Sequence, residues 1–208
     1  MSGPLNVSTL PFPLTPSDVD VWRHDDQSGR VIVEAPPRTD LYVNPGGQGS
    51  ADAESMLNAA TLVGTPPGGD FQFSARVSPD FRAQFDAGVL LLWIDEPHWA
   101  KFCFEFSPAS DPIVVSVVTR VVSDDANAFV VQDRSVWLRI CRVDHVYAFH
   151  ASSDGTRWQL IRVFGMGDAV SEHRKGFEAQ SPNGDGCTVT FNEIRFSRQS
   201  LADLRDGS

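Results

Sequence analysis

The sequence has few positive charges and few cysteines for its length. Its 208 residues include 17 lysines and arginines against 27 aspartates and glutamates, which gives a formal net charge of −10. A surface that binds nucleic acid needs clustered positive charge, and here the arginines are scattered singly. Three cysteines, an odd number, make a poor disulfide framework and are typical of a reducing compartment. We therefore expect no nucleic-acid partner.

Long apolar runs are also missing. No segment approaches the roughly 20 consecutive apolar residues that span a bilayer as a helix. The proline-rich start of the chain lacks both the basic residues and the apolar stretch of a signal peptide. These absences predict a cytoplasmic protein that does not contact membranes. Hydrophobic residues still make up 41% of the chain, with 14 phenylalanines, so the chain can form a substantial core.

Helical periodicity is absent as well. Apolar and polar residues alternate over short segments such as 71–77 and 136–143, which is typical of strands. The Asp-Gly pair at 154–155 predicts a tight hairpin turn. About a dozen strands without a helix predict an all-β sandwich of two antiparallel sheets.

The composition along the chain predicts one domain. We expect an extended N-terminal segment at residues 1–17, a single sandwich domain at 18–197 and a polar C-terminal tail at 198–208. Within the domain, residues 56–63 fit either a strand or a short helix. We expect loops at 123–127 and 165–176, and a loop or one weak helical turn at 48–55.

The segment 85–106 (FDAGVLLLWIDEPHWAKFCFEF) organises the rest of the chain. It predicts two strands joined by a tight polar turn. In the second strand Phe102 and Phe104 alternate with Lys101, Cys103 and Glu105, so one face is apolar and the other carries an ammonium, a thiol and a carboxyl group. The function of the second face is the main question that the sequence raises.

The packing of apolar groups predicts a register for this hairpin. We expect Leu92 to lie opposite Phe102, which places Trp93 opposite Lys101. A second strand, at 136–142, is divided in the same way, with its outer face formed by Trp137, Arg139 and Cys141. If the two strands belong to one sheet, Cys103 and Cys141 are neighbours, and Lys101, Glu105 and Arg139 share a trough walled by Trp93, Trp99 and Trp137.

Two interpretations of this trough stay open. Aromatic walls with a few polar groups suit a small polar ligand, above all a sugar. Against this, Lys101, Glu105 and Arg139 at alternate strand positions also fit an ion-pair ladder on an outward face, which is the more common arrangement. A single tryptophan such as Trp137 is more often a packing residue than a ligand contact.

Other chemistry is weakly supported. Asp124, Asp125 and Asn127 offer oxygen ligands for calcium, as do Asn183 and Asp185. Neither group matches the spacing of a calcium-binding loop, and turn formation accounts for both. The sequence also has no glycine-rich phosphate loop and no nucleophile elbow. We therefore expect no metal and no other cofactor.

Short motifs occur along the chain in an order found in one family. The motifs are Thr39-Asp40-Leu41-Tyr42, Gly69-Asp70-Phe71, Ala87-Gly88-Val89, Trp99-Ala100-Lys101, Glu105, Ser116-Val117-Val118-Thr119, Trp137-Leu138-Arg139, Ser153-Asp154-Gly155, Trp158, Arg162 and Ala179-Gln180-Ser181-Pro182. Over residues 18–197 the chain resembles the family of unknown function typified by the yeast regulation-of-enolase protein. That family has a concanavalin A-like lectin/glucanase fold and is similar to the C-terminal domain of some β-xylosidases.

The resemblance implies a jelly-roll of two antiparallel sheets, one of them concave. In that superfamily the concave face holds carbohydrate or catalytic carboxylates, and the shared motifs add Tyr42 and Gln180 to the expected ligand-binding residues. The chain departs from the family pattern at Asp125, which stands where the family has a tryptophan. An aromatic contact from that position is therefore not expected.

Three functions follow as hypotheses. The first is a binding protein for a carbohydrate or sugar-like metabolite, which it does not hydrolyse. The second is a small-molecule enzyme with Glu105 as general acid or base and Lys101 beside it. A glucanase needs a second carboxylate near Glu105, and the same strand offers none, so Asp40, Asp95 or Glu178 would have to supply it. The third, a regulatory domain with a protein partner, follows from the resemblance alone.

Overall fold

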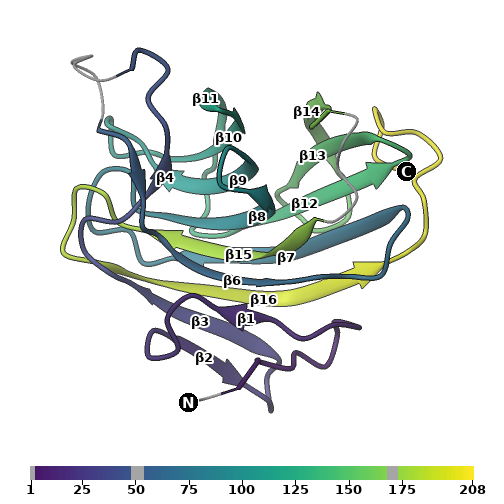
Figure 1. Cartoon of the computed structure of the whole chain (residues 1–208), viewed down its shortest axis with the longest axis horizontal. Coiled ribbons are helices and arrows are strands. Elements are labelled where there is room, and N and C mark those ends of the chain that lie inside the picture. Colours follow the sequence, from purple (N-terminus) through teal and green to yellow (C-terminus); the bar gives the residue numbers. More distant parts are fainter. Residues whose placement is uncertain (1–2, 48–53, 168–172) are drawn as a thin grey trace.

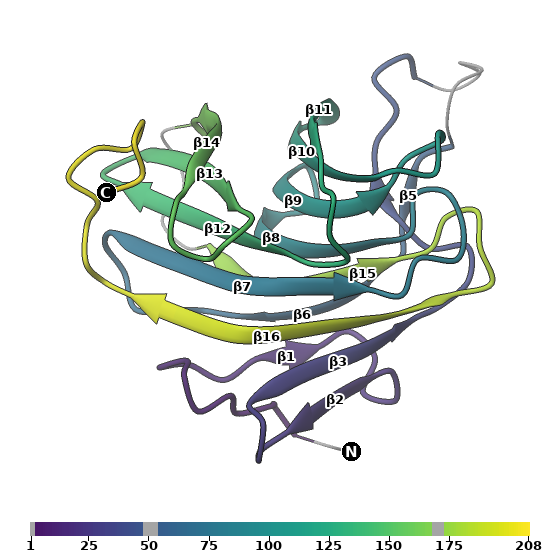
Figure 2. The same cartoon turned by 180° about the vertical axis from the view of Figure 1, so that it is seen from behind.

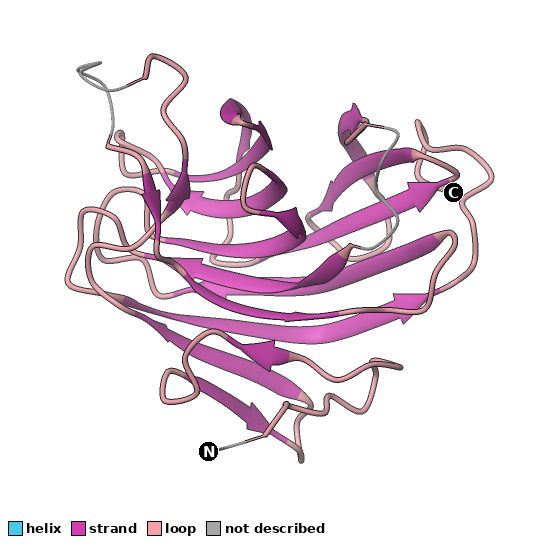
Figure 3. Ribbon diagram, in the orientation of Figure 1, coloured by secondary structure: helices cyan, strands magenta, loops and turns pink. Residues whose placement is uncertain are grey.

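The structure, a computed structural model, describes residues 3–47, 54–167 and 173–208. These residues form strands and loops and contain no helix (Figure 3). The strands are β1 (Thr15–Pro16), β2 (Trp22–Asp25), β3 (Arg30–Ala35), β4 (Leu41–Tyr42), β5 (Met56–Leu57), β6 (Ala60–Gly64), β7 (Phe71–Pro79), β8 (Ala87–Asp95), β9 (His98–Phe106), β10 (Pro112–Arg120), β11 (Val122–Val130), β12 (Val136–Val143), β13 (Val146–Ser152), β14 (Gln159–Phe164), β15 (Arg174–Gln180) and β16 (Cys187–Ser197). The all-β prediction is confirmed.

Two antiparallel sheets of seven strands form the sandwich. Sheet I has the order β1-β6-β15-β8-β9-β10-β11, and sheet II has the order β14-β13-β12-β7-β16-β3-β2. The opposite views in Figures 1 and 2 show the two sheets packed against each other as layers, with β4 and β5 as a separate small pair. The described part of the chain has no helix long and apolar enough to cross a membrane.

Aromatic side chains from both sheets fill the space between the layers. Phe102 of sheet I stacks on Phe149 of sheet II, with ring centroids 4.6 Å apart. Phe177 and Phe191 make a second contact between the sheets, at 4.5 Å. All four rings are buried, so the alternation of phenylalanine in the sequence marks the core face as predicted. Burying a phenylalanine contributes about 2–3 kcal/mol, which makes these rings a main source of stability.

One predicted loop is a strand. Residues 123–127 lie within β11, which pairs with β10 along its length, for example Asp125 with Val117. The prediction was wrong because β11 is the edge strand of sheet I, and most of its side chains are exposed. An edge strand is held by backbone hydrogen bonds on one side and needs no apolar alternation. The chain reverses before it at Val121, which has a positive φ of 73°.

The structure defines most of the segments that the sequence left ambiguous or predicted as loops. Residues 56–63 contain strand and no helix: residues 56–57 form β5, residues 60–63 belong to β6, and residues 58–59 connect the two strands. The loop expected at 165–176 ends earlier, since β15 already begins at Arg174. The parts of the two expected loops at 48–53 and 168–172 lie outside the described residues.

The register of the central hairpin differs from the prediction by two residues. Leu90, not Leu92, lies opposite Phe102, and Trp93 lies opposite Trp99 rather than Lys101. The turn is tighter than expected, and a β-bulge between Trp93 and Asp95 accommodates the shift in register. A shift of two residues leaves every side chain on its predicted face, because side chains alternate with a period of two.

Candidate functional site

The candidate site lies on the outer face of sheet I, around Lys101 in the middle of β9. Lys101 lies opposite Leu91 of β8 and opposite Val117 of β10. Val117 in turn lies opposite Asp125 of β11, so these four side chains share one face of the sheet. Although this face points away from the core, Lys101 is only 2% exposed. Another part of the chain must therefore cover it.

The segment around β4 covers Lys101. Leu41 of β4 and Leu91 of β8 belong to one apolar cluster on this outer face. Asp40, the residue before β4, accepts a hydrogen bond from Lys101, with Nζ and Oδ1 2.8 Å apart. Gln180 of β15 accepts a second one, with Nζ and Oε1 2.7 Å apart. The ammonium group is thus held between a strand of the sheet and the segment that lies over it.

Lys101 keeps its charge in this environment. Burial by itself lowers the pKa of an amine, but the nearby carboxylate of Asp40, joined by Glu178 when that group is ionised, outweighs burial and raises the pKa of Lys101 above its ordinary value. Two short hydrogen bonds to oxygen acceptors fix the direction of the side chain. Lys101 therefore presents a fixed positive charge beneath the cover.

Glu178 of β15 is the most deeply buried carboxyl group of the site. It is 0% exposed, and neither of its carboxyl oxygens has a hydrogen-bond partner among the described residues. Burial raises the pKa of Glu178 to about 8, with Lys101 opposing the shift and Asp40 adding to it. At neutral pH Glu178 is therefore mostly protonated.

Glu105 lies on the same face as Lys101, near the end of β9. It is half-buried and lies opposite Ala87 of β8. Burial raises its pKa to about 8; Lys101 opposes this shift, and the carboxylates of Asp125, Asp40 and Glu178 add to it. Asp40 and Glu178 are thus close enough to Glu105 to interact electrostatically with it.

This face carries both hydrogen-bond donors and hydrogen-bond acceptors. Lys101 donates, the ionised carboxylate of Asp40 accepts, and the protonated carboxyl of Glu105 can do both. Burial also raises the pKa of Asp125. A face with one ammonium and several carboxyl groups repels anions and suits neutral hydroxyl groups, which also donate and accept.

Comparison with known proteins identifies the family. The family described as "Protein of unknown function (DUF1349)" matches residues 18–199. The chain belongs to this family. Among curated proteins, it is 28% identical to "Regulation of enolase protein 1" of Saccharomyces cerevisiae over 169 residues, which are 80% of this chain and 81% of the yeast protein.

Solved structures confirm the fold of this DUF1349 chain. A functionally unknown protein from Saccharomyces cerevisiae superposes with a TM-score of 0.77 at 23% identity, over 93% of this chain and 98% of that one. A xylan β-1,4-xylosidase from Bacillus halodurans superposes with a TM-score of 0.69 at 10% identity, over 87% of this chain but 35% of the xylosidase. A β-sandwich of two antiparallel sheets is therefore the fold of this family member.

The expected trough does not include Arg139 and Trp137. Both belong to β12 of sheet II and lie on its outer face, whereas Lys101 and Glu105 lie on the outer face of sheet I. For the same reason Cys103 and Cys141 are not neighbours across a sheet. The prediction required β9 and β12 to share a sheet, and the chain instead crosses from sheet I to sheet II after β11.

The aromatic residues expected at the site contribute mainly to packing. Trp99 is 0% exposed, and its indole N–H donates to the backbone carbonyl of Glu96, 3.1 Å away. Trp93 lies opposite Trp99 and is partly exposed, with the guanidinium of Arg174 5.8 Å from its ring centroid. Tyr42 is partly exposed on β4. Of these three rings, Trp93 and Tyr42 present accessible surface.

Three of the groups around Lys101 come from segments far away in the sequence. Asp40 precedes β4, Asp125 lies on β11 and Glu178 lies on β15. From the sequence, Asp40 and Glu178 were predicted only as candidates for a second carboxylate, and Asp125 was predicted to lie in a loop. Alternation could have placed Glu178 on the outer face of its strand, but the strand order that brings β15 beside β8 is not visible in the sequence.

The expectation of no metal stays a prediction. In the described part of the chain, no three histidine, cysteine, aspartate or glutamate side chains are arranged to hold a metal ion. Asp124, considered for calcium, instead forms an ion pair with Arg162 at 2.9 Å.

Proposed function

We propose that this chain binds a carbohydrate or sugar-like metabolite on the outer face of sheet I and does not hydrolyse it. The observation that carries the proposal is the half-buried carboxyl group of Glu105 on the outer face of sheet I, which also carries the buried ammonium of Lys101. Sugars are recognised by such adjacent donors and acceptors near an aromatic surface, and Trp93 and Tyr42 offer partly exposed rings. Carbohydrate-active enzymes with domains of this fold support the ligand class.

The burial of Glu178 supports binding without hydrolysis. Hydrolysis with retention needs two carboxyl groups about 5 Å apart that both reach the substrate. Glu105 is accessible in part, but Glu178 is 0% exposed beneath the face. A ligand that enters from solvent therefore meets one carboxyl group of this pair and not both.

The test is a thermal-shift screen of the full chain against mono- and oligosaccharides, followed by calorimetric titration of each hit. We expect at least one sugar to bind, and Glu105→Gln to weaken this binding several-fold, since a hydrogen bond between neutral groups contributes about 0.5–1.5 kcal/mol. Glu96→Gln is the matched control, because Glu96 is exposed in the turn of the same hairpin. The proposal is wrong if no sugar raises the melting temperature, or if the two variants bind equally well.

A second candidate is an enzyme that uses Glu105 as general acid or base. The observation that favours it is the raised pKa of Glu105, about 8, to which Asp40 and Glu178 contribute. General acids work best when their pKa is close to the working pH. Incubation with each bound sugar should then yield products, and Glu105→Gln should abolish them. Full turnover in Glu105→Gln would rule this candidate out.

A regulatory role with a protein partner is a third proposal, supported by the name of the yeast relative. Its test is calorimetric titration of the chain with purified enolase, which should release or absorb heat if the two proteins bind. A cytoplasmic location is part of all three proposals, and the free thiols of Cys103, Cys141 and Cys187 are compatible with it.

A further inference from the structure

The last residues of the chain lie across the outer face of sheet II. We name residues 199–208 the C-terminal strap. The strap begins where Gln72 of β7 donates a hydrogen bond to the carbonyl of Gln199, at 3.0 Å. Further along, Leu201 is buried, with 8% of its surface exposed. In Figure 1 this yellow segment runs beside the ends of β12 and β13. The strap therefore docks on the sheet.

Two buried side chains of the sheet hold the strap by its backbone. Arg139 of β12 donates from Nη2 to the carbonyl of Gly207, at 2.8 Å. His150 of β13 donates from Nε2 to the carbonyl of Leu204, at 2.7 Å. The two residues lie opposite each other in the β12–β13 pair, so their donors form one polar centre. The strap supplies this centre with neutral carbonyl oxygens.

The close approach depends on glycine at position 207. Gly207 has a φ of +76°, which side-chain-bearing residues rarely adopt. A Cβ atom there would lie 2.7 Å from Nη2 of Arg139 and 3.0 Å from Cβ of Trp158. Any larger residue would push the strap away from the arginine.

Arg139 is a buried cation without a buried anion. It is 5% exposed, and its guanidinium lies 4.2 Å from the ring centroid of Trp158. Its second acceptor is the neutral side-chain oxygen of Gln72, 3.3 Å from Nη1. Among the described residues no carboxylate forms an ion pair with it, and its Nε–H has no partner. Buried charges are usually paired, so this site is incomplete.

His150 is a fixed neutral donor next to that cation. It is 0% exposed, and burial lowers its pKa to about 4, so the ring is uncharged at neutral pH. Because Nε2 faces a carbonyl oxygen, the proton is on Nε2, while Nδ1 faces the sulfur of Cys141 at 3.8 Å. The centre thus combines a guanidinium fork and one imidazole N–H.

We propose that the C-terminal strap occupies a binding site for an oxyanion, a carboxylate or phosphate group, on the outer face of sheet II. An oxyanion that displaces the strap can bind Arg139 through Nε and Nη2 together, which gives the unpartnered Nε–H an acceptor. It can also accept the proton of His150 Nε2. Two-pronged binding of this kind is the geometry that arginine favours with carboxylates and phosphates.

The charge of the strap fits a competitor for an anion. The strap carries Asp203 and Asp206, and Asp206 is close enough to His150 to raise its pKa. When the strap lifts, the two aspartates leave together with Arg205, so the side chains that leave carry a net charge of −1 and the local field becomes more positive. The site is therefore closed to anions while the strap is docked, and it attracts anions when the strap is released.

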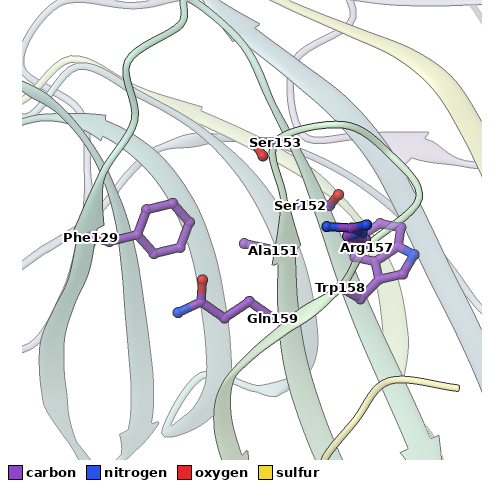
Figure 4. A pocket seen from close by; sticks show the side chains of 7 residues that line it. All are labelled: Phe129, Ala151, Ser152, Ser153, Arg157, Trp158 and Gln159. Atoms are coloured by element: carbon purple, nitrogen blue, oxygen red, sulfur yellow. The ribbon is translucent and has the colours of Figure 1, made fainter.

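A neighbouring pocket offers room for the rest of such a ligand. Its volume is about 230 Å³, and Trp158, which stacks on Arg139, lines it together with Phe129, Arg157 and Gln159. Figure 4 shows Phe129 on one side of this pocket, with Arg157 and Trp158 on the opposite side. A ligand larger than the oxyanion itself can extend toward this pocket.

The test uses the full chain with the strap displaced by substitution. The variants are Gly207→Ala and the stronger double variant Leu201→Asp, Gly207→Val. In both, the amides of residues 202 and 207, which donate to Ser208 and Asp203 within the strap, should exchange hydrogen at least tenfold faster than in wild type, because a strap released from the sheet loses its folded conformation. Inorganic phosphate and malonate, titrated separately by calorimetry at constant ionic strength, should then bind at least tenfold more tightly, because the strap no longer competes. The stronger of the two ions identifies the oxyanion class.

Two control variants separate this proposal from general effects of mutation. Gly165→Ala should change neither exchange nor anion binding, because a Cβ at Gly165 meets open space. Arg139→Gln in the strap-released background should abolish the gain in anion binding. The proposal is overturned if a released strap brings no gain for either ion, or if the gain survives Arg139→Gln. Sheet I, the site of the proposed sugar binding, is not involved in either outcome.

Discussion

The outer faces of the two sheets use similar residues in opposite ways. On sheet I, Lys101 lies among carboxyl groups and donates hydrogen bonds to Asp40 and Gln180. On sheet II, Arg139 sits among neutral oxygens and a tryptophan, covered by the end of the chain. Each cation lies in the middle of a long strand, and each is almost completely buried.

The difference shows that the covering segment decides the chemistry of a strand face. The segment over Lys101 brings a carboxylate, which neutralises the ammonium. The segment over Arg139 brings a glycine carbonyl, which leaves the guanidinium without a counter-charge. We therefore expect the first face to select uncharged polar ligands and the second to select anions.

The largest expected effect is the loss of the charge on sheet I. Lys101→Met leaves the partly buried Asp40 carboxylate without its cation, and breaking a buried pair in this way costs about 3–5 kcal/mol. Urea denaturation at pH 7 should show this loss as a lower midpoint at unchanged slope.

A second buried lysine provides the matched control. Lys175 is 0% exposed, lies 3.6 Å from the centroid of Phe71, and its Nζ has no hydrogen-bond partner among the described residues. Burial and the nearby Arg142 lower its pKa to about 6. Lys175→Met should therefore stabilise the fold, by about 1–3 kcal/mol. A loss of stability in both variants would contradict the distinction between a paired and an unpaired amine.

The next largest effect depends on pH. The pKa of Glu178 is about 8 in the folded chain against an ordinary 4.5, so the folded state holds this proton more tightly than the unfolded state. Between pH 4.5 and 8 the wild type therefore loses stability as pH rises. Glu178→Gln lacks this loss. Relative to wild type, the free energy of unfolding of Glu178→Gln should therefore increase by on the order of 3 kcal/mol between pH 5 and pH 8.

Melting temperatures of the two proteins, measured across this pH range, test the prediction. Glu96→Gln, at an exposed turn, should follow the wild-type curve. Parallel curves for Glu178→Gln and wild type would mean that Glu178 is ionised in the folded chain.

A smaller effect is expected on sheet II. Arg139→Lys keeps the charge but loses the fork that holds the strap, which should cost about 1–3 kcal/mol. Hydrogen exchange of the Gly207 amide should accelerate with it. Arg157→Lys is the control, because Arg157 is exposed in the neighbouring loop. If exchange at Gly207 does not change in Arg139→Lys, Arg139 does not hold the strap.

The smallest effect concerns a stack at the same face. The guanidinium of Arg76 lies 4.6 Å from the ring centroid of Trp137, and both side chains are partly exposed. Arg76→Gln should cost about 1 kcal/mol or less, as exposed cation–π contacts do. Arg23→Gln, which removes a surface ion pair with Glu34, should cost a similar amount or less. A loss above 3 kcal/mol for Arg76→Gln would show that this stack is a main support of the sheet.

Much of the fold was predictable because strands have a local signature. Alternation placed Phe102 in the core and Lys101 on the opposite face, and the register error of two residues left both assignments intact. The edge strand β11 was missed because most of its side chains are exposed, so its sequence does not alternate between apolar and polar residues. Gly155, with a φ of 73°, correctly marked the reversal between β13 and β14, but this connection runs over residues 153–158 and is longer than the tight hairpin that was expected.

The sequence by itself determined the all-β class, the inward and outward faces of the strands, and the presence of Lys101 and Glu105 on an outward face. Only the tertiary structure decided that Arg139 belongs to the other sheet, that Asp40 and Glu178 surround Lys101, and that the C-terminal strap covers Arg139. The physical reason is how far apart in the sequence the interacting residues lie. Alternation with a period of two is encoded in neighbouring residues, whereas sheet membership and covering segments depend on pairings between distant parts of the chain.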